Sequence, residues 1–370
     1  MTSRERLLTV LRGEIPDCVP VAPDTSNMVP AKLTGKPFWD LYLYNDPPIW
    51  KAYIDCVKYF GFDSLMDGYV EIDTEPVDKS WRTVVILKNS EQIITQKTNG
   101  KEWAAAADVY YKDNPPCCGI DLKTLKLPAV PLEYTELSGV KEQPRGEELL
   151  GLVKEEIGDH GLVGVSCGTS SLIGTEQAIY DYYDYPEKFE KKRDNLIESY
   201  TERFHKLMSF TCKPDFICTG SSGTLVYQTP EVFDKLGLPI IKHIADLCRA
   251  YNIPSHIHSC GPETHVVKRC YENTDLTVID PLEIPPMGDC DLKSLKEKYG
   301  DRLVLKGNLH TTDVMLMGSR EDVVNACKKA IDEAAAGGRF ILSTGDQCGR
   351  DTPFENIFAM IETARTYGRY

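Results

Sequence analysis

The chain has 370 residues, of which 42% are hydrophobic and 26% are charged, so it can bury the core of one large domain or of two ordinary ones. Its formal net charge of −14 disfavours nucleic acid, whose binding needs a basic surface, and weighs against substrates that carry many negative charges. No run approaches the ~18 apolar residues of a membrane span and the charged start is unlike a secretory signal, which predicts a cytoplasmic protein with reduced cysteines.

Short apolar runs, often β-branched, recur along the chain and are usually followed by amphipathic stretches. In chain order, the predicted strands are 18–22, 63–66, 162–166, 215–219, 255–258, 276–279, 303–305 and 340–343. Strands that alternate with helices predict a parallel sheet with crossover helices. Eight such units at this length favour a closed barrel, so the predicted fold is α/β, a (β/α)8 TIM barrel.

Start signals mark three of the expected helices. Thr229 and Thr352 each precede a proline and offer an N-cap hydroxyl, and Ser319 can cap a helix that ends near the glycines 337–338. Residues 81–111 break the alternation, because they have strand character and a turn signal at Asn99-Gly100. We therefore predict one barrel domain, residues 1–370, with residues 76–120 as a β-rich insertion between strands 2 and 3.

Polar and metal-binding side chains follow the predicted strands. Because active sites of such barrels lie at the carboxyl ends of the strands, these side chains are expected to share one rim. They include Asp24, Ser221, His258, Cys260, Glu283, Asn308, His310, Asp346 and Cys348.

The pattern His258-x-Cys260 is the sharpest candidate for a metal site. Side chains two apart on a strand point to the same face, and Cys348 would approach from the loop after the eighth strand. One imidazole and two thiolates suit zinc, and three protein ligands with an open position are typical of catalytic zinc. The alternative is coincidence, because a chain with 13 cysteines and seven histidines can contain such a spacing by chance.

Other rim residues have softer assignments. Glu283 is a candidate fourth ligand or proton acceptor, or simply a loop carboxylate that precedes a helix. His256 shares the face of His258 and is either a partner that supports the ligand or a core histidine. Asp346 is a candidate for substrate contact or a solvated loop carboxylate. The loop 220–223, which contains Ser221, resembles a phosphate cradle only loosely and is expected to let substrate approach closely.

Several motifs together are typical of one family: Thr2-Ser-Arg-Glu-Arg-Leu-Leu, Arg12-Gly-Glu-Ile-Pro-Asp-Cys-Val-Pro-Val, Thr229-Pro-Glu-Val-Phe, Leu238-Pro, His258-Ser-Cys-Gly, Asp280-Pro-Leu-Glu, Gly288-Asp, Lys306-Gly-Asn, Gly337-Gly-Arg-Phe-Ile-Leu-Ser, Thr352-Pro and Glu355-Asn. Over nearly its whole length the chain resembles the uroporphyrinogen decarboxylase superfamily, and within it the corrinoid-dependent methyltransferases. The resemblance implies a (β/α)8 barrel and zinc on His258, Cys260 and Cys348. Glu283 is similar to a further carboxylate that some members place near the zinc.

The resemblance implies a zinc methyltransferase that moves methyl from a small O-methyl donor, such as an aryl methyl ether, to a corrinoid on a partner corrinoid protein. Glu283 and Asp346 are then expected to be catalytic, and Asn308 and Ser221 to contact the cofactor. Transfer from methylcobamide to a thiol, a decarboxylase-type lyase and a non-catalytic corrinoid-binding subunit remain alternatives. The lyase is disfavoured. The resemblance implies that a decarboxylase has an arginine-rich motif soon after the first strand, but this chain has no arginine between Arg12 and Arg82.

Overall fold

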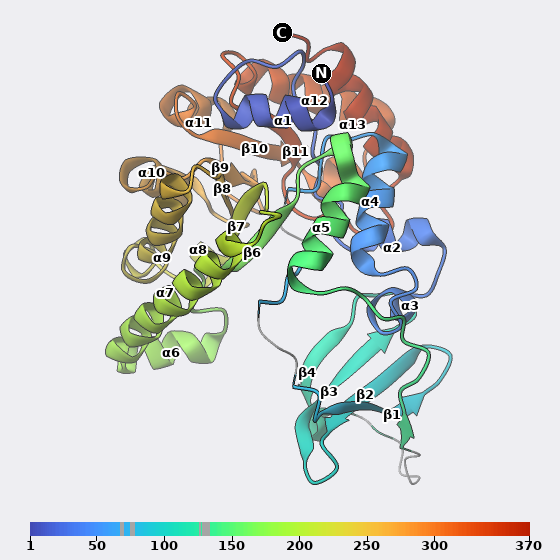
Figure 1. The fold of residues 1–370 in the computed structure, drawn as a ribbon. Helices are drawn as coiled ribbons and strands as arrows, with labels where there is room; N and C mark the ends of the chain where they lie inside the picture. Colours follow the sequence, from blue (N-terminus) through green and yellow to red (C-terminus); the bar gives the residue numbers. More distant parts are fainter. Residues whose placement is uncertain (67–69, 75–77, 126, 128–133) are drawn as a thin grey trace. The chain divides into compact units, whose positions relative to one another are not determined.

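The structure, a computed structural model, describes residues 1–370 except 67–69, 75–77, 126 and 128–133 (Figure 1). Unit 1 of its two compact units comprises Met1–Thr25, Val57–Thr74 and Gly146–Tyr370. Unit 2 comprises Ser26–Cys56 and Glu75–Arg145. Within the described ranges, no helix combines the length and the apolar character that crossing a bilayer requires.

Unit 1 is built on a parallel sheet of six strands in the order β11-β10-β9-β8-β7-β6. The strands are β6 (Gly164–Thr169), β7 (Phe216–Gly220), β8 (Ser255–His258), β9 (Val278–Asp280), β10 (Val304–Leu309) and β11 (Phe340–Thr344). Their neighbours in the sheet are also neighbours in the chain, which is the order that successive strand–helix units produce. Six of the eight predicted strands are thus confirmed, and each begins within two residues of the predicted start. β6 ends three residues and β10 four residues later than predicted.

Helices connect the strands of unit 1. Those before β6 are α1 (Ser3–Leu11), α5 (Gly146–Ile157) and the short η2 (Gly158–His160). Those that follow β6 are α6 (Glu176–Asp184), α7 (Pro186–Ser209), α8 (Thr224–Tyr227), α9 (Pro230–Ala250), α10 (Thr264–Asn273), α11 (Leu292–Tyr299), η3 (Thr311–Leu316), α12 (Arg320–Ala334) and α13 (Phe354–Thr366).

Two further segments extend the sheet at its edges. Val21 forms a parallel bridge with Leu342 in β11, and Val70 forms one with Val165 in β6. The Asp63 amide donates to the Val21 carbonyl at 2.7 Å. Unit 1 thus has the alternation of parallel strands and helices expected of the predicted (β/α)8 barrel, with six strands in the sheet and one bridge at each edge. The prediction of a strand at 63–66 is wrong: these residues are irregular, and the Ser64 hydroxyl instead bonds to the Leu162 backbone at 2.8 and 3.0 Å.

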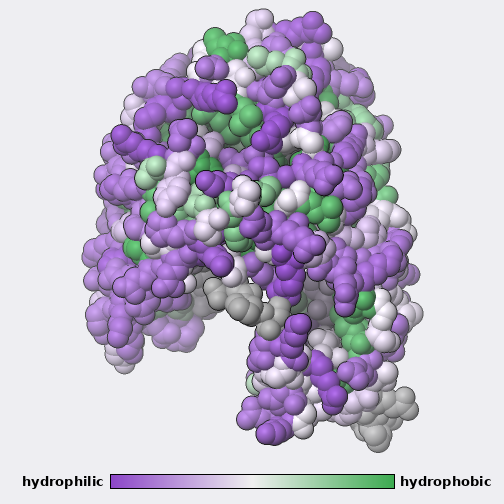
Figure 2. Space-filling view, viewed as in Figure 1, coloured by the Kyte–Doolittle hydropathy of each residue, from purple (hydrophilic) through white to green (hydrophobic). Residues whose placement is uncertain are grey.

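One hydrophobic cluster fills the centre of unit 1. It joins Leu7, Val10 and Leu11 of α1 to inward side chains from around the sheet: Ala22, Met66, Leu162, Phe216, Cys218, Val278, Val304 and Ile341. Figure 1 shows α1 across one end of the strands. Because the same cluster collects side chains from almost every strand position, it is the packed interior that a barrel requires. The outer face in Figure 2 is mostly hydrophilic.

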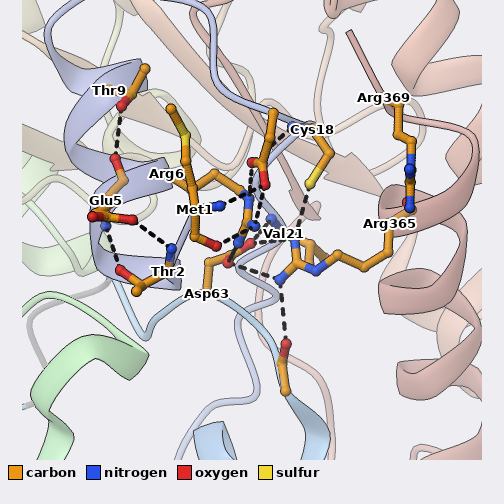
Figure 3. A network of polar contacts seen from close by, with 12 residues as sticks. Met1, Thr2, Glu5, Arg6, Thr9, Cys18, Val21, Asp63, Arg365 and Arg369 are labelled. Carbon is orange, nitrogen blue, oxygen red and sulfur yellow. Dashed lines mark hydrogen bonds and ion pairs between the residues drawn. The ribbon is translucent and has the colours of Figure 1, made fainter.

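Ion pairs fasten the chain start to the barrel (Figure 3). The buried carboxylate of Asp63 accepts hydrogen bonds from Arg6 at 2.6 Å, from Arg365 at 2.8 Å and from the Val21 amide at 2.8 Å. Arg6 also bonds to Asp17 at 2.7 Å, and this contact holds the pKa of Asp17 below its usual range. Each of these charges has a partner, so the desolvation of Asp63 is offset by several charge-assisted hydrogen bonds.

Unit 2 contains an antiparallel sheet in the order β4-β3-β2-β1-β5. Its strands are β1 (Arg82–Lys88), β2 (Gln92–Thr98), β3 (Trp103–Tyr111), β4 (Cys117–Asp121) and β5 (Thr135–Glu136). The predicted turn at Asn99-Gly100 joins β2 to β3, with Gly100 at φ 86°. The remaining elements are α2 (Met28–Thr34), α3 (Phe38–Tyr42), α4 (Ile49–Phe60), which begins here and ends in unit 1, and η1 (Leu122–Thr124). The single-domain organisation with an insertion at 76–120 stays a prediction.

Candidate functional site

Three potential metal ligands meet at the carboxyl ends of β8 and β11. His258 ends β8, Cys260 follows two residues later, and Asp346 lies in the loop after β11. One ligand atom from each lies within 4.8 Å of the other two, and His258 Nε2 is 3.5 Å from Asp346 Oδ1. All three side chains are partly exposed, so the cluster is open to solvent. The structure thus brings together two predicted metal ligands and one predicted catalytic carboxylate.

Cys348, the third predicted ligand, is not part of this group in the described chain. It is fully buried, and its amide donates to the Asp24 carbonyl at 2.8 Å. Asp346, two residues earlier, occupies the third position instead. The role of Cys348 as a ligand therefore stays a prediction.

The loop that carries Asp346 has a strained backbone. Asp346 has φ 122°, a region that side chains other than glycine rarely adopt. Hydrogen bonds on both sides hold the loop, from the Gly345 amide to the Leu309 carbonyl at 2.6 Å and from the Cys348 amide to Asp24. Strain of this kind persists where surrounding contacts fix it, and it is concentrated at functional sites. The backbone thus directs the Asp346 carboxylate toward His258.

Asp280 at the end of β9 supports His258 from the barrel interior. Its Oδ1 lies 3.2 Å from His258 Nδ1 and 3.1 Å from His256 Nε2, and its Oδ2 forms an ion pair with buried Lys306. Burial opposes ionisation of Asp280, but Lys306 and the two histidines hold its pKa well below the usual range. Burial also opposes charge on His258, yet Asp280 and Asp346 raise the pKa of His258 well above its usual value. The surroundings of His258 therefore favour the protonated, cationic form of its imidazole.

Two buried carboxyl groups lie beside the cluster. Glu283 Oε2 accepts from the Gly261 amide at 2.5 Å; burial and Asp346 raise the pKa of Glu283, against the opposite effects of Gly261, His258 and His310. Glu263 Oε2 accepts from the Leu282 amide at 2.7 Å, and burial raises the pKa of Glu263 well above its usual value. Carboxyl groups of this kind can hold a proton where an exposed carboxylate would not.

The two predicted cofactor-binding residues lie at the same rim but take part in internal hydrogen bonds. Ser221 is fully buried, its hydroxyl bonds to Ser170 at 2.8 Å and to Thr224 at 2.7 Å, and its amide donates to the His258 carbonyl at 2.7 Å. Asn308 Nδ2 donates to the Leu282 carbonyl at 3.1 Å. Both residues support the strand ends, and their contact with a cofactor stays a prediction.

Sequence reasoning did not single out Glu263 or Lys306 as site residues. Lys306 contributed only to the family motif, and its position inside β10 marks it as a core residue until the partner Asp280 is known. Glu263 follows Cys260 by three residues and stands at the start of α10, where a carboxylate is common for helix-end reasons alone. The ion pair between Lys306 and Asp280 can be recognised only when the register of β9 and β10 is known.

Fold and site together define a (β/α)8 protein with a candidate metal centre at the carboxyl ends of its strands. A family model for uroporphyrinogen decarboxylase (URO-D) matches residues 148–367, more than half of the 370-residue chain. The chain therefore belongs to the uroporphyrinogen decarboxylase family, which confirms the resemblance drawn from the sequence motifs.

Individual relatives are methyltransferases. The chain is 26% identical over 137 residues to the methylcobamide:CoM methyltransferase MtbA of Methanosarcina acetivorans, and 27% identical over 139 residues to that of Methanosarcina mazei. Each match spans 37% of this chain and 37% of the relative. A solved methyltransferase from Methanosarcina mazei superimposes over 99% of both chains with a TM-score of 0.62 and 17% identity, which supports the fold. These relatives agree with the methyltransferase branch of the resemblance.

Proposed function

We propose that the chain is a corrinoid-dependent methyltransferase with zinc at His258 and Cys260. The observation that carries the proposal is the group His258, Cys260 and Asp346 at the barrel rim. Imidazole nitrogen, thiolate sulfur and carboxylate oxygen are all ligands of zinc, so the residues present fit the metal. The named methylcobamide relatives support a corrinoid as the methyl carrier. Cys348 is the proposed further ligand, in place of or beside Asp346.

The chemistry that a bound zinc would supply is Lewis acidity, which stabilises negative charge on the heteroatom that loses or gains methyl. The chain's own residues prepare this position. Asp280 lies next to His258 Nδ1 and fixes the imidazole so that Nε2 faces the rim. Lys306 balances the charge of Asp280 in the interior, so Asp280 stays ionised while it holds His258.

Glu283 is the proposed proton donor. Its raised pKa means that Glu283 holds a proton at a higher pH than an exposed glutamate does. The Gly261 amide donates to Oε2 and so fixes the position of the carboxyl group. An alkoxide or phenoxide that leaves from a methyl ether needs such a proton. This favours the O-methyl donor that the sequence predicts, for example an aryl methyl ether, with methyl delivered to a corrinoid on a partner protein.

A second candidate is transfer of methyl from the corrinoid to a small thiol. The named relatives favour it, because both are methylcobamide:CoM methyltransferases. The same site serves this direction, since zinc stabilises thiolates as well as oxyanions. In that case Glu283 takes the proton that the thiol releases.

The test offers both substrates to the zinc-loaded protein. Under anaerobic conditions, reduced cobalamin is mixed with methoxybenzene derivatives, and methylcobalamin is mixed with coenzyme M; absorbance follows the corrinoid. We expect methylcobalamin to form from the ether. Glu283→Gln should slow this by about a hundredfold, whereas the exposed Glu187→Gln on α7 should have no effect. Methyl transfer at the full rate by zinc-free protein would contradict the proposal.

A further inference from the structure

A cavity of about 230 Å³ opens between α6 and α8. Its wall is mostly aliphatic and aromatic, with Ile173, Tyr182, Tyr183, Val226 and Tyr227, and it also contains Thr229 and the amide of Gln228. Two large side chains of this wall, Tyr183 and Val226, are well exposed, at 64% and 58%. Exposed apolar side chains around a hollow are typical of a surface that binds another molecule.

Gln228 is the unusual member of this wall. The residue is 7% exposed, and neither Oε1 nor Nε2 of its amide has a hydrogen-bond partner among the described residues. Buried amide groups in proteins are nearly always paired, because an unpaired one has lost its water without compensation. None of the described side chains in the wall bonds to this amide, so a molecule that satisfies it has to supply both a donor and an acceptor.

The loop before α8 joins the wall of the cavity to the backbone that carries two of the candidate metal ligands. The Ser221 amide donates to the His258 carbonyl at 2.7 Å, and the Gly223 amide donates to the Cys260 carbonyl at 3.2 Å. On α8, Val226 Cγ2 lies so close to Gly261 that a Cβ there would be 2.9 Å away. A large ligand at the metal centre would therefore also meet this cavity.

We propose that the cavity binds a carboxamide group on the rim of the corrinoid, and that Gln228 recognises it through a reciprocal pair of hydrogen bonds. This inference rests on the proposed function. A carboxylate could only accept and an ammonium could only donate, whereas a primary carboxamide does both and so matches both ends of the glutamine. The rim of a corrin ring combines carboxamide arms with methyl groups, which matches one amide in an apolar and aromatic wall.

Binding of two metal-complexed corrins tests the proposal without turnover. Dicyanocobinamide keeps the carboxamide arms, and dicyanocobyrinic acid heptamethyl ester replaces them with esters that accept but cannot donate. Equilibrium dialysis of the full chain, followed by corrin absorbance, gives the two dissociation constants. Gln228→Leu replaces the amide with an apolar side chain of similar size. Gln177→Leu is the matched control, because Gln177 is exposed on α6 and bonds to Asp181.

Wild-type protein should bind the cobinamide about tenfold more tightly than the ester, the difference expected for a hydrogen-bonded amide. Gln228→Leu should erase that preference and leave ester binding unchanged, and Gln177→Leu should behave as wild type. If wild type binds both corrins equally and Gln228→Leu changes nothing, the inference fails while the proposed function stands. If wild type binds neither corrin, both fail. Binding of benzamide that depends on Gln228, without cobinamide binding, would assign the cavity to a small amide and overturn the corrinoid.

Discussion

At the scale of single residues, the candidate site depends on charge more than on shape. Asp280, Asp346, Glu263 and Glu283 bring four carboxyl groups to one rim, and only Lys306 among the groups bonded to Asp280 carries a permanent positive charge. Burial raises the pKa of Glu263 and Glu283, and Asp280 and Asp346 raise that of His258 against the effect of burial, so the surroundings favour the protonated form of each group. A bound zinc ion would replace those protons, so metal affinity should rise with pH.

The first prediction concerns which residues hold the metal. Protein purified without chelator should contain about one equivalent of zinc, and Cys260→Ala should reduce it below about a tenth. Asp346→Asn and Cys348→Ala separate the two candidates for the third ligand by elemental analysis. Cys212→Ala, at a partly exposed cysteine outside the ligand group, is the control. Zinc-free wild-type protein that is fully folded would rule out the metal centre.

Cys348→Ala also tests whether the site is structural. Because Cys348 lies in a loop after β11, its loss should abolish methyl transfer while circular dichroism and the unfolding transition stay those of a folded barrel. Normal turnover in this variant would show that Asp346, and not Cys348, completes the site.

The sequence predicted the strand that positions the site more accurately than the loop that completes it. His258 and Cys260 could be placed together because strand geometry fixes the direction of alternate side chains, and β8 has the predicted bounds. The third position could not be predicted in this way. Asp346 and Cys348 belong to a loop whose course depends on a positive φ at Asp346 and on hydrogen bonds to residues far away in sequence. No local pattern encodes those partners.

At the scale of elements, local signals predicted two helix starts and missed a third. Thr229 accepts from the Val232 amide at the start of α9, and Ser319 forms a capping box with Asp322 at the start of α12, as expected. The expected cap at Thr352 is wrong, because α13 begins after Pro353 and the Thr352 hydroxyl is buried with no hydrogen-bond partner in the described structure. The tertiary fold buries the Thr352 hydroxyl away from the helix start, so the N-cap that the local sequence favours does not form.

These three residues predict different stability effects. Ser319→Ala and Thr229→Ala should each lower the free energy of unfolding by about 1 kcal/mol, because each removes an N-cap. Thr352→Val removes an unpaired buried hydroxyl and keeps the shape, so it should leave stability unchanged or raise it. Urea unfolding of the three variants measures this. A loss for Thr352→Val as large as that for Ser319→Ala would show that Thr352 caps the helix after all.

Asp215, just before β7, joins three elements and predicts a pH dependence. Its carboxylate bonds to Arg4 of α1 at 2.6 Å and to Lys154 of α5 at 2.9 Å. Burial opposes ionisation, but the bonds to Arg4 and Lys154 prevail and lower the pKa of Asp215. A carboxyl whose pKa is lower in the folded state stabilises the protein above its unfolded pKa, about 3.9, and loses that contribution as the pH falls through the folded value.

Asp215→Asn should therefore destabilise the protein by about 1–3 kcal/mol at pH 7, and the difference from wild type should shrink as the pH is lowered below about 4. Urea unfolding at both pH values, with the exposed Asp159→Asn as control, measures it. A difference that stays constant down to pH 3 would mean that the lost packing of Asp215, and not its charge, accounts for the effect.

At the scale of the whole molecule, the two ends of the barrel have different charge chemistry. The end covered by α1 gathers arginines that are already paired, since Arg6 and Arg365 both bond to Asp63 (Figure 3). Arg4 likewise bonds to Asp215. The opposite rim gathers carboxyl groups around His258. This division follows the general pattern of such barrels, in which one end serves stability and the other serves chemistry.

That division predicts which reaction of the family the chain performs. Decarboxylation of a porphyrinogen requires fixed cations for many carboxylates, but the rim is acidic, the net charge is −14, and the early arginines are bonded at the far end. We therefore expect methyl transfer with cobalamin and no decarboxylation of uroporphyrinogen. One preparation should be offered both chemistries, with absorbance following the corrinoid and chromatography following the porphyrins. Formation of coproporphyrinogen without any change in the corrinoid would overturn the methyltransferase proposal. Methyl transfer that is lost when Cys260 is replaced by alanine would tie the reaction to the rim.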